Sequence, residues 1–315
     1  MAHWAKDATE LVGRTPLVEL KCITKGLNAT ILAKLEMFSP GGSIKDRIAL
    51  QMVREAEEQG ALLPGGVIVE PTSGNMGISL AWVAAARGHE CILTMPDTIA
   101  LERRLLLRRF GARIILTAGN QGMRGAINKV NELLTTVPNA WQPQQFSNPA
   151  NAQAHREYTA PEIWEESGGA VDMVVIGVGT GGTLTGVAEG LRALKPELEV
   201  VAVEPANCAV LSGKRPGPHR IEGLGPGFIP EILNVSLIDR VIAVTDQDAV
   251  TTATRIIMEE GLSVGMSSGA VAWAAMQEAH KPENAGKVIV TIFASSAERY
   301  LQSILFDDLR NATKS

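Results

Sequence analysis

The chain has 315 residues, of which 45% are hydrophobic, 4% aromatic and 20% charged, and its formal net charge at pH 7 is -5. Because domains average about 150 residues, this length predicts two domains, each large enough for a hydrophobic core of its own. Surfaces that bind nucleic acid carry an excess of basic residues and aromatic rings, so the acidic balance and the few aromatics exclude that class.

Short runs rich in Val and Ile alternate with helical segments along most of the chain. The expected strands are Thr30–Leu35, Gly66–Glu70, Cys91–Met95, Arg113–Thr117, Met173–Gly177, Glu199–Glu204, Val241–Thr245 and Lys287–Phe293. The expected helices are Lys45–Gln59, Met76–Arg87, Leu101–Phe110, Arg124–Leu134, Gly182–Leu194, Asp246–Glu260 and Ser268–Glu278. Continuous apolar strands are typical of parallel sheets that are buried on both faces, and their alternation with helices predicts an α/β fold.

The loop from Gln142 to Pro149 breaks this alternation and is the predicted crossing between two domains. We expect a smaller N-terminal α/β domain over residues 46–150, inserted into a larger one made of residues 1–45 and 151–315. Ligands of open α/β sheets bind beyond the carboxyl ends of the strands. Four loops have that position, namely those after Glu70, Gly177, Thr245 and Phe293.

The first chemically suggestive segment is Ser43-Ile44-Lys45-Asp46, which follows Pro-Gly-Gly and opens a helix. Ser43 and Asp46 have the spacing of a capping box, so one interpretation is a capped helix with a solvated lysine. The other is a nucleophilic lysine, because the positive end of a helix disfavours a charged ammonium group.

The second segment, Glu70–Gly77, joins a buried strand to a helix through Thr-Ser-Gly-Asn. Backbone N–H groups and short polar side chains at a helix start suit a carboxylate or a phosphate. Ordinary helix capping is the alternative. Helix capping is also one interpretation of the segment Val264–Ala270, and the other is that the hydroxyl of Ser267 contacts a ring nitrogen of a bound heterocycle.

A third segment follows the strand that ends at Gly177. Three glycines have the spacing Gly-x-Gly-x-x-Gly: Gly177, Gly179 and Gly182. With Glu204 about 20 residues further on, this pattern fits a dinucleotide site, so an NAD-dependent oxidoreductase is one alternative. The hydroxyls of Thr180 and Thr183 also suit a single phosphate monoester.

A lysine, a phosphate cradle, a carboxylate-binding loop and a serine for a pyridine nitrogen are together what a pyridoxal-phosphate enzyme needs. Over nearly its whole length the sequence resembles the cysteine synthase and β-cyanoalanine synthase family of fold-type-II pyridoxal-phosphate enzymes. The motifs that carry the resemblance lie at residues 11–17, 40–47, 70–77, 145–151, 179–183, 223–230 and 267–269. The resemblance implies two three-layer α/β domains like those of the tryptophan synthase β chain, with the active site in the interdomain cleft.

The resemblance also implies roles for individual residues. Lys45 would bond covalently to pyridoxal 5'-phosphate and act as the base at the substrate α-carbon. The other cofactor-binding residues would be Asn75, Gly179, Thr180, Gly181, Gly182, Thr183 and Ser267. The substrate-binding residues would be Thr72, Ser73, Gly74, Met76, Gln145 and Gly223.

The implied reaction is β-replacement through an aminoacrylate intermediate. Two departures from the usual cysteine synthase pattern, Met76 and the segment 293–300, resemble the β-cyanoalanine synthase branch. Our first expectation is therefore β-cyanoalanine synthase, which converts L-cysteine and cyanide into β-cyano-L-alanine and sulfide, with O-acetylserine sulfhydrylase (cysteine synthase) as a side activity. The alternative is cysteine synthase, which converts O-acetyl-L-serine and sulfide into L-cysteine and acetate.

The resemblance further implies a homodimer, with the C-terminal tail of a serine acetyltransferase as a candidate partner. A non-catalytic relative that only clasps such a tail is a second alternative, although Lys45, Asn75 and Ser267 argue against it. Neither the histidines nor the three cysteines have the spacing of a metal site or a disulfide framework. Without a signal peptide or a membrane-spanning run, we expect a cytoplasmic protein that binds neither metal nor membrane.

Overall fold

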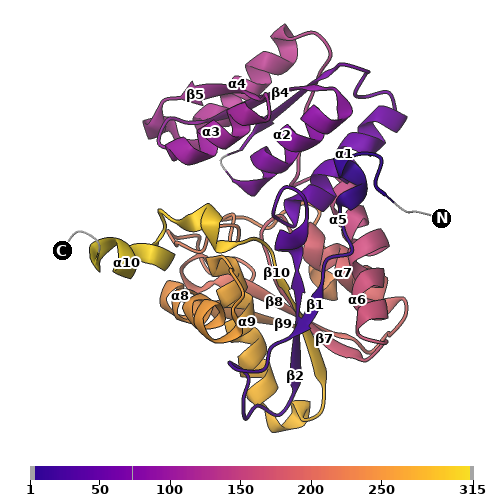
Figure 1. Cartoon of the computed structure of the whole chain (residues 1–315), viewed down its shortest axis with the longest axis vertical. Coiled ribbons are helices and arrows are strands. Elements are labelled where there is room, and N and C mark those ends of the chain that lie inside the picture. Colours follow the sequence, from indigo (N-terminus) through magenta and orange to yellow (C-terminus); the bar gives the residue numbers. More distant parts are fainter. Residues whose placement is uncertain (1–3, 73, 313–315) are drawn as a thin grey trace. The chain divides into compact units, whose positions relative to one another are not determined.

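The computed structural model describes residues 4–72 and 74–312. They form two compact units, each with its own sheet. Unit 1 consists of Met1–Val12 and Ser39–Asn151, and unit 2 of Gly13–Phe38 and Ala152–Ser315. Figure 1 shows the elements of both along the chain.

Unit 1 has a parallel four-stranded sheet in the order β5-β4-β3-β6. Its strands are β3 (Val67–Pro71), β4 (Glu90–Pro96), β5 (Arg113–Thr117) and β6 (Ala140–Trp141). Its helices are α1 (Lys45–Glu58), α2 (Asn75–Arg87), α3 (Leu101–Arg109) and α4 (Gly122–Thr136). Helix α2 ends at a left-handed glycine, Gly88, whose φ is 76°.

The sheet of unit 1 is covered on both faces. Val67 and Val69 of β3 pack with Val130 and Leu133 of α4 in one apolar cluster. Because successive side chains of a strand point to opposite faces, Ile68 and Glu70 face the other way. Helix α2 packs on β3 and β4, and all its residues from Met76 to Ala84 are buried. Helix α2 is buried over this stretch because α1 and the 3-10 helix Ala8–Leu11 also pack on it.

Unit 2 has a six-stranded sheet in the order β1-β2-β10-β7-β8-β9, parallel except for the edge strand β1. Its strands are β1 (Leu17–Glu19), β2 (Thr30–Leu35), β7 (Val171–Gly177), β8 (Glu199–Pro205), β9 (Arg240–Val244) and β10 (Val288–Phe293). Its main helices are α6 (Ala160–Glu166), α7 (Gly182–Arg192), α8 (Asp246–Arg255), α9 (Met266–His280) and α10 (Asp307–Ala312). Helix α5 (Ala150–Ala154) spans the boundary between the units, and π-helical turns cover His155–Thr159 and Ile256–Glu260.

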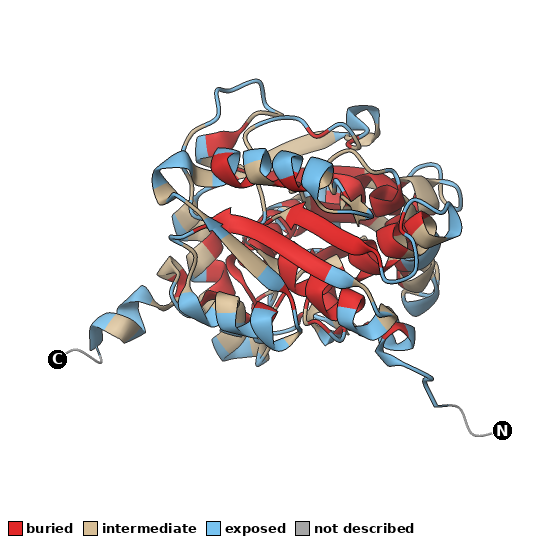
Figure 2. Ribbon diagram, turned by 90° about the horizontal axis from the view of Figure 1, so that it is seen from above, coloured by how far each residue is buried: buried red, intermediate tan, exposed pale blue. Residues whose placement is uncertain are grey.

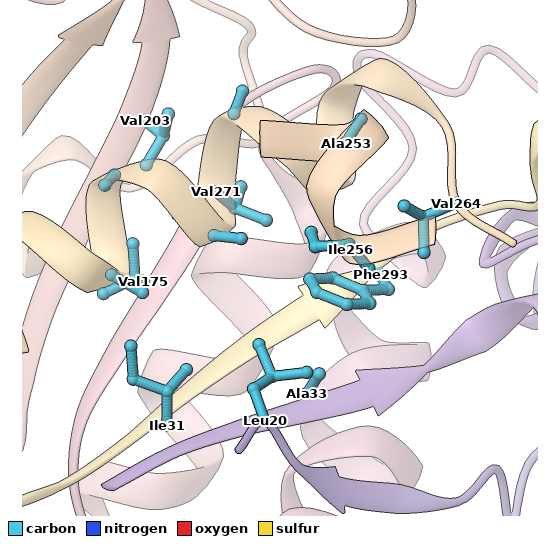
Figure 3. Close-up of a cluster of buried hydrophobic side chains, with 14 of the residues drawn as sticks. Leu20, Ile31, Ala33, Val175, Val203, Ala253, Ile256, Val264, Val271 and Phe293 are labelled. Atoms are coloured by element: carbon cyan, nitrogen blue, oxygen red, sulfur yellow. The ribbon is translucent and has the colours of Figure 1, made fainter. Parts of the chain in front are cut away.

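The core of unit 2 lies between the sheet and helices α8 and α9. Ile31, Val175, Val203 and Phe293 from four strands pack there against Val271 of α9 (Figure 3). On the opposite face Lys34, which is fully buried, pairs with Glu162 at 2.9 Å and Glu166 at 2.6 Å on α6. Figure 2 shows buried strands lying between helices whose outer faces are exposed. Each unit is therefore a three-layer α/β sandwich.

The bounds of the units differ from the expected domains at the N-terminal side. Residues 39–45 belong to unit 1, because the carboxylate of Asp46 accepts the backbone N–H of Gly41 and so fixes this loop to α1. Residues 1–12 also belong to unit 1, where the 3-10 helix Ala8–Leu11 packs on α2. Among the described residues, no helix is both long and apolar enough to cross a membrane.

Candidate active site

Lys45 is the first residue of α1 and its side chain is partly buried. Burial lowers the pKa of Lys45 from 10.5 to about 8, since the charged ammonium loses its hydration. The amine is thus much closer to neutrality at physiological pH than that of a solvated lysine. The capping box expected from Ser43 and Asp46 takes another form: Ser43 Oγ accepts the N–H of Lys45 at 3.3 Å, and Asp46 turns back to Gly41.

Asp46 connects the start of α1 to α2. Its buried carboxylate accepts the N–H of Gly41 at 2.6 Å, the hydroxyl of Ser79 at 2.6 Å and the indole N–H of Trp82 at 2.8 Å. A side chain at Gly41 would have its Cβ 2.4 Å from Asp46 Oδ1, so only glycine allows this approach. The carboxylate therefore positions the loop that carries Lys45, a role that the sequence did not reveal.

The predicted substrate loop lies between β3 and α2. The N–H of Thr72 donates to the carbonyl of Thr94 at 3.0 Å, and the N–H of Gly74 lies 3.4 Å from Thr72 Oγ1. Gly74 is the extended N-cap residue of α2, whose first residues are the half-buried Asn75 and the buried Met76. The first N–H groups of a helix lack partners within it, so this end suits an anion. Ser73 lies outside the described residues.

Gln145 follows β6 and is held by a residue that the sequence analysis passed over. Glu70, at the end of β3, is 3% exposed, and the pairing of Ile68 with Trp141 places it beside the turn that follows β6, where the N–H groups of Gln144 and Gln145 and the side chain of Gln142 lower its pKa. The carbonyl of Gln145 accepts the side-chain N–H of Asn151 at 2.7 Å. Unit 1 thus contains three predicted segments: Thr72–Met76 and Gln145 follow the carboxyl ends of β3 and β6, and Asp46 ties the Lys45 segment to α2.

In unit 2 the glycine-rich turn joins β7 to α7. Gly181 is the N-cap of α7 with φ at 86°, a left-handed value that favours glycine. A Cβ on Gly179 would lie 2.3 Å from the carbonyl oxygen of Gly223, and one on Gly181 would lie 2.6 Å from Leu233 Cβ. The structure therefore brings the predicted substrate residue Gly223 against the predicted phosphate loop.

This turn has the features of a phosphate cradle. The N-terminal N–H groups of α7, a helix of 11 residues, follow a turn without side chains at Gly179 and Gly181. Thr183 adds a hydroxyl, and its Oγ1 lies 3.1 Å from Nε2 of the buried His155, whose Nδ1 is 2.9 Å from Thr159 Oγ1. The residues present thus fit a phosphate monoester. No motif of the sequence pointed to His155.

Ser267 lies in the first turn of α9 and is buried. The start of α9 is held by the segment 293–300, because the N–H of Gly265 donates to the carbonyl of Ser295 at 3.0 Å. The ring of Tyr300 packs so close to Gly265 that a Cβ there would lie 2.4 Å from it, and the hydroxyls of Tyr300 and Ser295 are 2.7 Å apart. The segment 293–300, the second departure from the usual cysteine synthase pattern, therefore stabilises the start of α9, which carries Ser267.

Glu204 does not serve as the ribose ligand of the dinucleotide alternative. It is buried, and its two carboxylate oxygens accept the backbone N–H of Leu211 at 2.9 Å, that of Ser212 at 3.0 Å and the hydroxyl of Ser212 at 2.6 Å. Both oxygens are therefore engaged within the protein.

Comparison with known proteins decides the family. The sequence model of the pyridoxal-phosphate dependent enzymes matches residues 8–295. The chain belongs to this family. The α/β fold, the fold-type-II architecture and the pyridoxal-phosphate cofactor expected from the sequence are thereby confirmed, and the NAD-dependent alternative is wrong.

Relatives of this pyridoxal-phosphate enzyme match it over nearly their whole length. A probable cysteine synthase of Bacillus subtilis is 49% identical over 303 residues, which are 95% of this chain and 97% of the relative. A cysteine synthase of Staphylococcus aureus is 47% identical over 96% of this chain and 98% of the relative. The crystal structure of a cysteine synthase from Entamoeba histolytica has a TM-score of 0.94 and 44% identity, and covers 96% of this chain and 91% of that one.

Proposed function

We propose that the protein is a cysteine synthase, which converts O-acetyl-L-serine and sulfide into L-cysteine and acetate. The observation that carries this proposal is the similarity, at 47–49% identity and almost end to end, to relatives named cysteine synthase. These names support the alternative of the sequence analysis better than its first expectation, β-cyanoalanine synthase. The homodimer, the acetyltransferase partner and the cytoplasmic location stay predictions.

The residues that would hold the cofactor are those that the resemblance of the sequence implies. Lys45 would carry it covalently, Asn75 would bind its ring hydroxyl and Ser267 its ring nitrogen. The phosphate would lie on the turn at the start of α7, with Gly179, Thr180, Gly181, Gly182 and Thr183. Pyridoxal phosphate, when bound, supplies an electron-withdrawing ring that stabilises negative charge at the substrate α-carbon.

The chain's own groups would then perform binding and proton transfer. A general base works best when its pKa lies near the working pH, and the pKa of the buried Lys45 amine, about 8, suits removal of the α-proton. Thr72, Gly74 and Gln145, with Ser73, would bind the substrate carboxylate through N–H groups at the start of α2 and through side-chain donors. Gly223 would face the reacting amino acid.

Met76 is the residue on which the choice of leaving group depends. Its side chain is 2% exposed in the first turn of α2. A thioether accepts hydrogen bonds weakly and donates none, so it cannot replace the threonine hydroxyl of the usual motif. If Met76 changed the preferred leaving group from acetate to sulfide, cysteine and cyanide would react faster than O-acetylserine and sulfide.

The test compares two reactions of the purified holoenzyme. Formation of cysteine from O-acetylserine and sulfide should exceed release of sulfide from cysteine and cyanide by at least about tenfold in kcat/KM, which corresponds to about 1.4 kcal/mol in transition-state binding. Met76→Thr should raise this ratio, while Met258→Thr, at a side chain 79% exposed, should leave it unchanged. A faster reaction with cyanide in the unmodified enzyme would overturn the proposal.

A further inference from the structure

Glu70 is a charged residue at the end of an otherwise apolar strand, and it is nearly inaccessible. The strand β3 reads Val-Ile-Val-Glu-Pro, and Glu70 is 3% exposed. One of its carboxylate oxygens, Oε2, is buried without a hydrogen-bond partner among the described residues. Burying an ionisable group with an unsatisfied oxygen destabilises a fold, so a neutral residue of the same shape would suit stability better.

The other bonds of the carboxylate show what it holds. The pairing of Ile68 with Trp141 places Glu70 beside the turn 142–145, and the donors of this turn that act on its carboxylate are the backbone N–H groups of Gln144 and Gln145 and the side-chain amide of Gln142. Gln144 has a φ of 56°, which is uncommon for a residue other than glycine and persists where the surroundings fix it. Glu70 is thus the acceptor that faces Gln144, the residue whose backbone is strained.

The remainder of the turn fixes Gln145 from the other side. The carbonyl of Gln144 accepts the N–H groups of Ser147 and Asn148, both at 3.0 Å, and the carbonyl of Gln145 accepts the amide of Asn151 at 2.7 Å. Both peptide groups that flank the Cα of Gln145 are therefore tied down. The position of the Gln145 side chain therefore depends on Glu70, which acts on its N–H, and on Asn151, which donates to its carbonyl.

We propose that Glu70 is a positioning residue: its buried carboxylate holds the turn 142–145 in the strained form that presents the Gln145 side chain to the substrate carboxylate. This inference rests on the proposed function, in which Gln145 binds that carboxylate. This role explains why a charged residue is buried at position 70, because an ionised acceptor holds N–H groups more firmly than a neutral one.

The titration of Glu70 offers a signature that a merely structural residue would lack. Burial raises the pKa of Glu70 to about 7. The N–H groups of Gln144 and Gln145 and the side chain of Gln142 act in the opposite direction and lower this pKa. Cys91 on the neighbouring strand β4 also faces it, and burial, with a contribution from the Glu70 charge, raises the pKa of that thiol to about 12. The turn itself contains no titratable side chain, and the charged residue of α2, Arg87, pairs with Glu57. Lys45, whose pKa is lowered to about 8, is the same in the unmodified enzyme and in a Glu70 variant, so a pH-dependent ratio between the two can be assigned to Glu70.

The chain also supplies a matched control. Strand β8 ends in Glu204-Pro205, as β3 ends in Glu70-Pro71, and Glu204 is likewise buried and holds backbone N–H groups of the following loop. Leu211 and Ser212, the residues that Glu204 holds, precede the predicted substrate residue of that loop, Gly223, by eleven residues or more. Glu204→Gln therefore makes the same chemical change at an equivalent position.

The experiment combines steady-state kinetics with hydrogen–deuterium exchange of the holoenzyme. Glu70→Gln should raise the KM for O-acetylserine about tenfold at pH 8.5, the order expected when one hydrogen bond to a charged group weakens, with kcat changed less than about twofold. The ratio of the variant's KM to that of the unmodified enzyme should fall toward one at pH 5.5. Peptides that cover residues 142–150 should exchange faster in the variant at pH 8.5.

Glu204→Gln should accelerate exchange of the peptide around residues 206–212 and leave the KM for O-acetylserine unchanged. Glu70→Asp keeps the negative charge but shortens the side chain by one methylene group, so it should also raise the KM for O-acetylserine. This second variant keeps the inference testable if Glu70→Gln fails to fold. Unchanged exchange of residues 142–150, or a KM ratio that does not vary with pH, would overturn the inference. If the unmodified enzyme did not turn over O-acetylserine, the proposed function would fail, while the exchange data would still decide whether Glu70 holds the turn.

Discussion

The lowered pKa of Lys45 can be tested directly in the protein freed of its cofactor. With the ordinary lysine value of 10.5, about one amine in three thousand would be neutral at pH 7, whereas with a pKa of about 8 about one in ten would be. The structure therefore predicts roughly 300-fold more of the reactive form at this position. Loss of hydration at the start of α1 is the physical cause.

Competitive acetylation at a series of pH values, read by mass spectrometry, measures this quantity. Lys45 should reach half of its maximal reactivity near pH 8, while Lys21, whose side chain is 72% exposed, serves as the reference in the same sample. A midpoint for Lys45 above about pH 10 would refute the argument from burial.

Three further predictions concern stability. Gly179→Ala would place a Cβ 2.3 Å from the Gly223 carbonyl oxygen, so it should lower the unfolding free energy by about 2 kcal/mol and weaken cofactor binding, as thermal unfolding and cofactor titration would show. Asp46→Asn turns one acceptor into a donor, which would face the N–H of either Gly41 or Trp82, and should cost about 1–3 kcal/mol in urea denaturation; no loss would contradict the role given to this carboxylate. The Glu70 carboxyl has a folded-state pKa above its unfolded value of 4.5, so its contribution to stability is full below about pH 4.5 and is lost as the pH rises to about 7. Glu70→Gln should remove this loss, about 3 kcal/mol at most, and denaturation at pH 5 and pH 8 should show the variant gaining at the higher pH only.

The sheets could be predicted well because their strands are short continuous runs of Val and Ile, a pattern that few other structures give. Thr30–Leu35 and Arg113–Thr117 were predicted to the residue, and the other expected strands differ by one or two residues at their ends. Residues 150–166 were missed as helix, since Pro161 and several charges interrupt the apolar period. The burial of this segment depends on Gly186 of α7, where a Cβ would lie 2.1 Å from the Ala152 carbonyl, and periodicity does not reveal such a contact.

The predicted site residues lie on glycine turns and helix starts because those requirements are local and visible in the sequence. Asp46 and Glu70 were passed over, because a charge in the first turn of a helix or at the end of a strand is usually solvated. A signal for Glu70 existed, since it is the one charge in the strand Val67–Pro71, but its partners come from a turn more than 70 residues away. Such partners become visible only in three dimensions.

The bond between the indole of Trp82 and the carboxylate of Asp46 gives this enzyme a built-in optical probe. The ring is buried, and its N–H ends on the residue next to Lys45. Indole emission depends on polarity and hydrogen bonding, so a version that keeps Trp82 and replaces the other four tryptophans with phenylalanine would report the state of the lysine loop without any label. Loading of the cofactor could then be followed in real time by fluorescence.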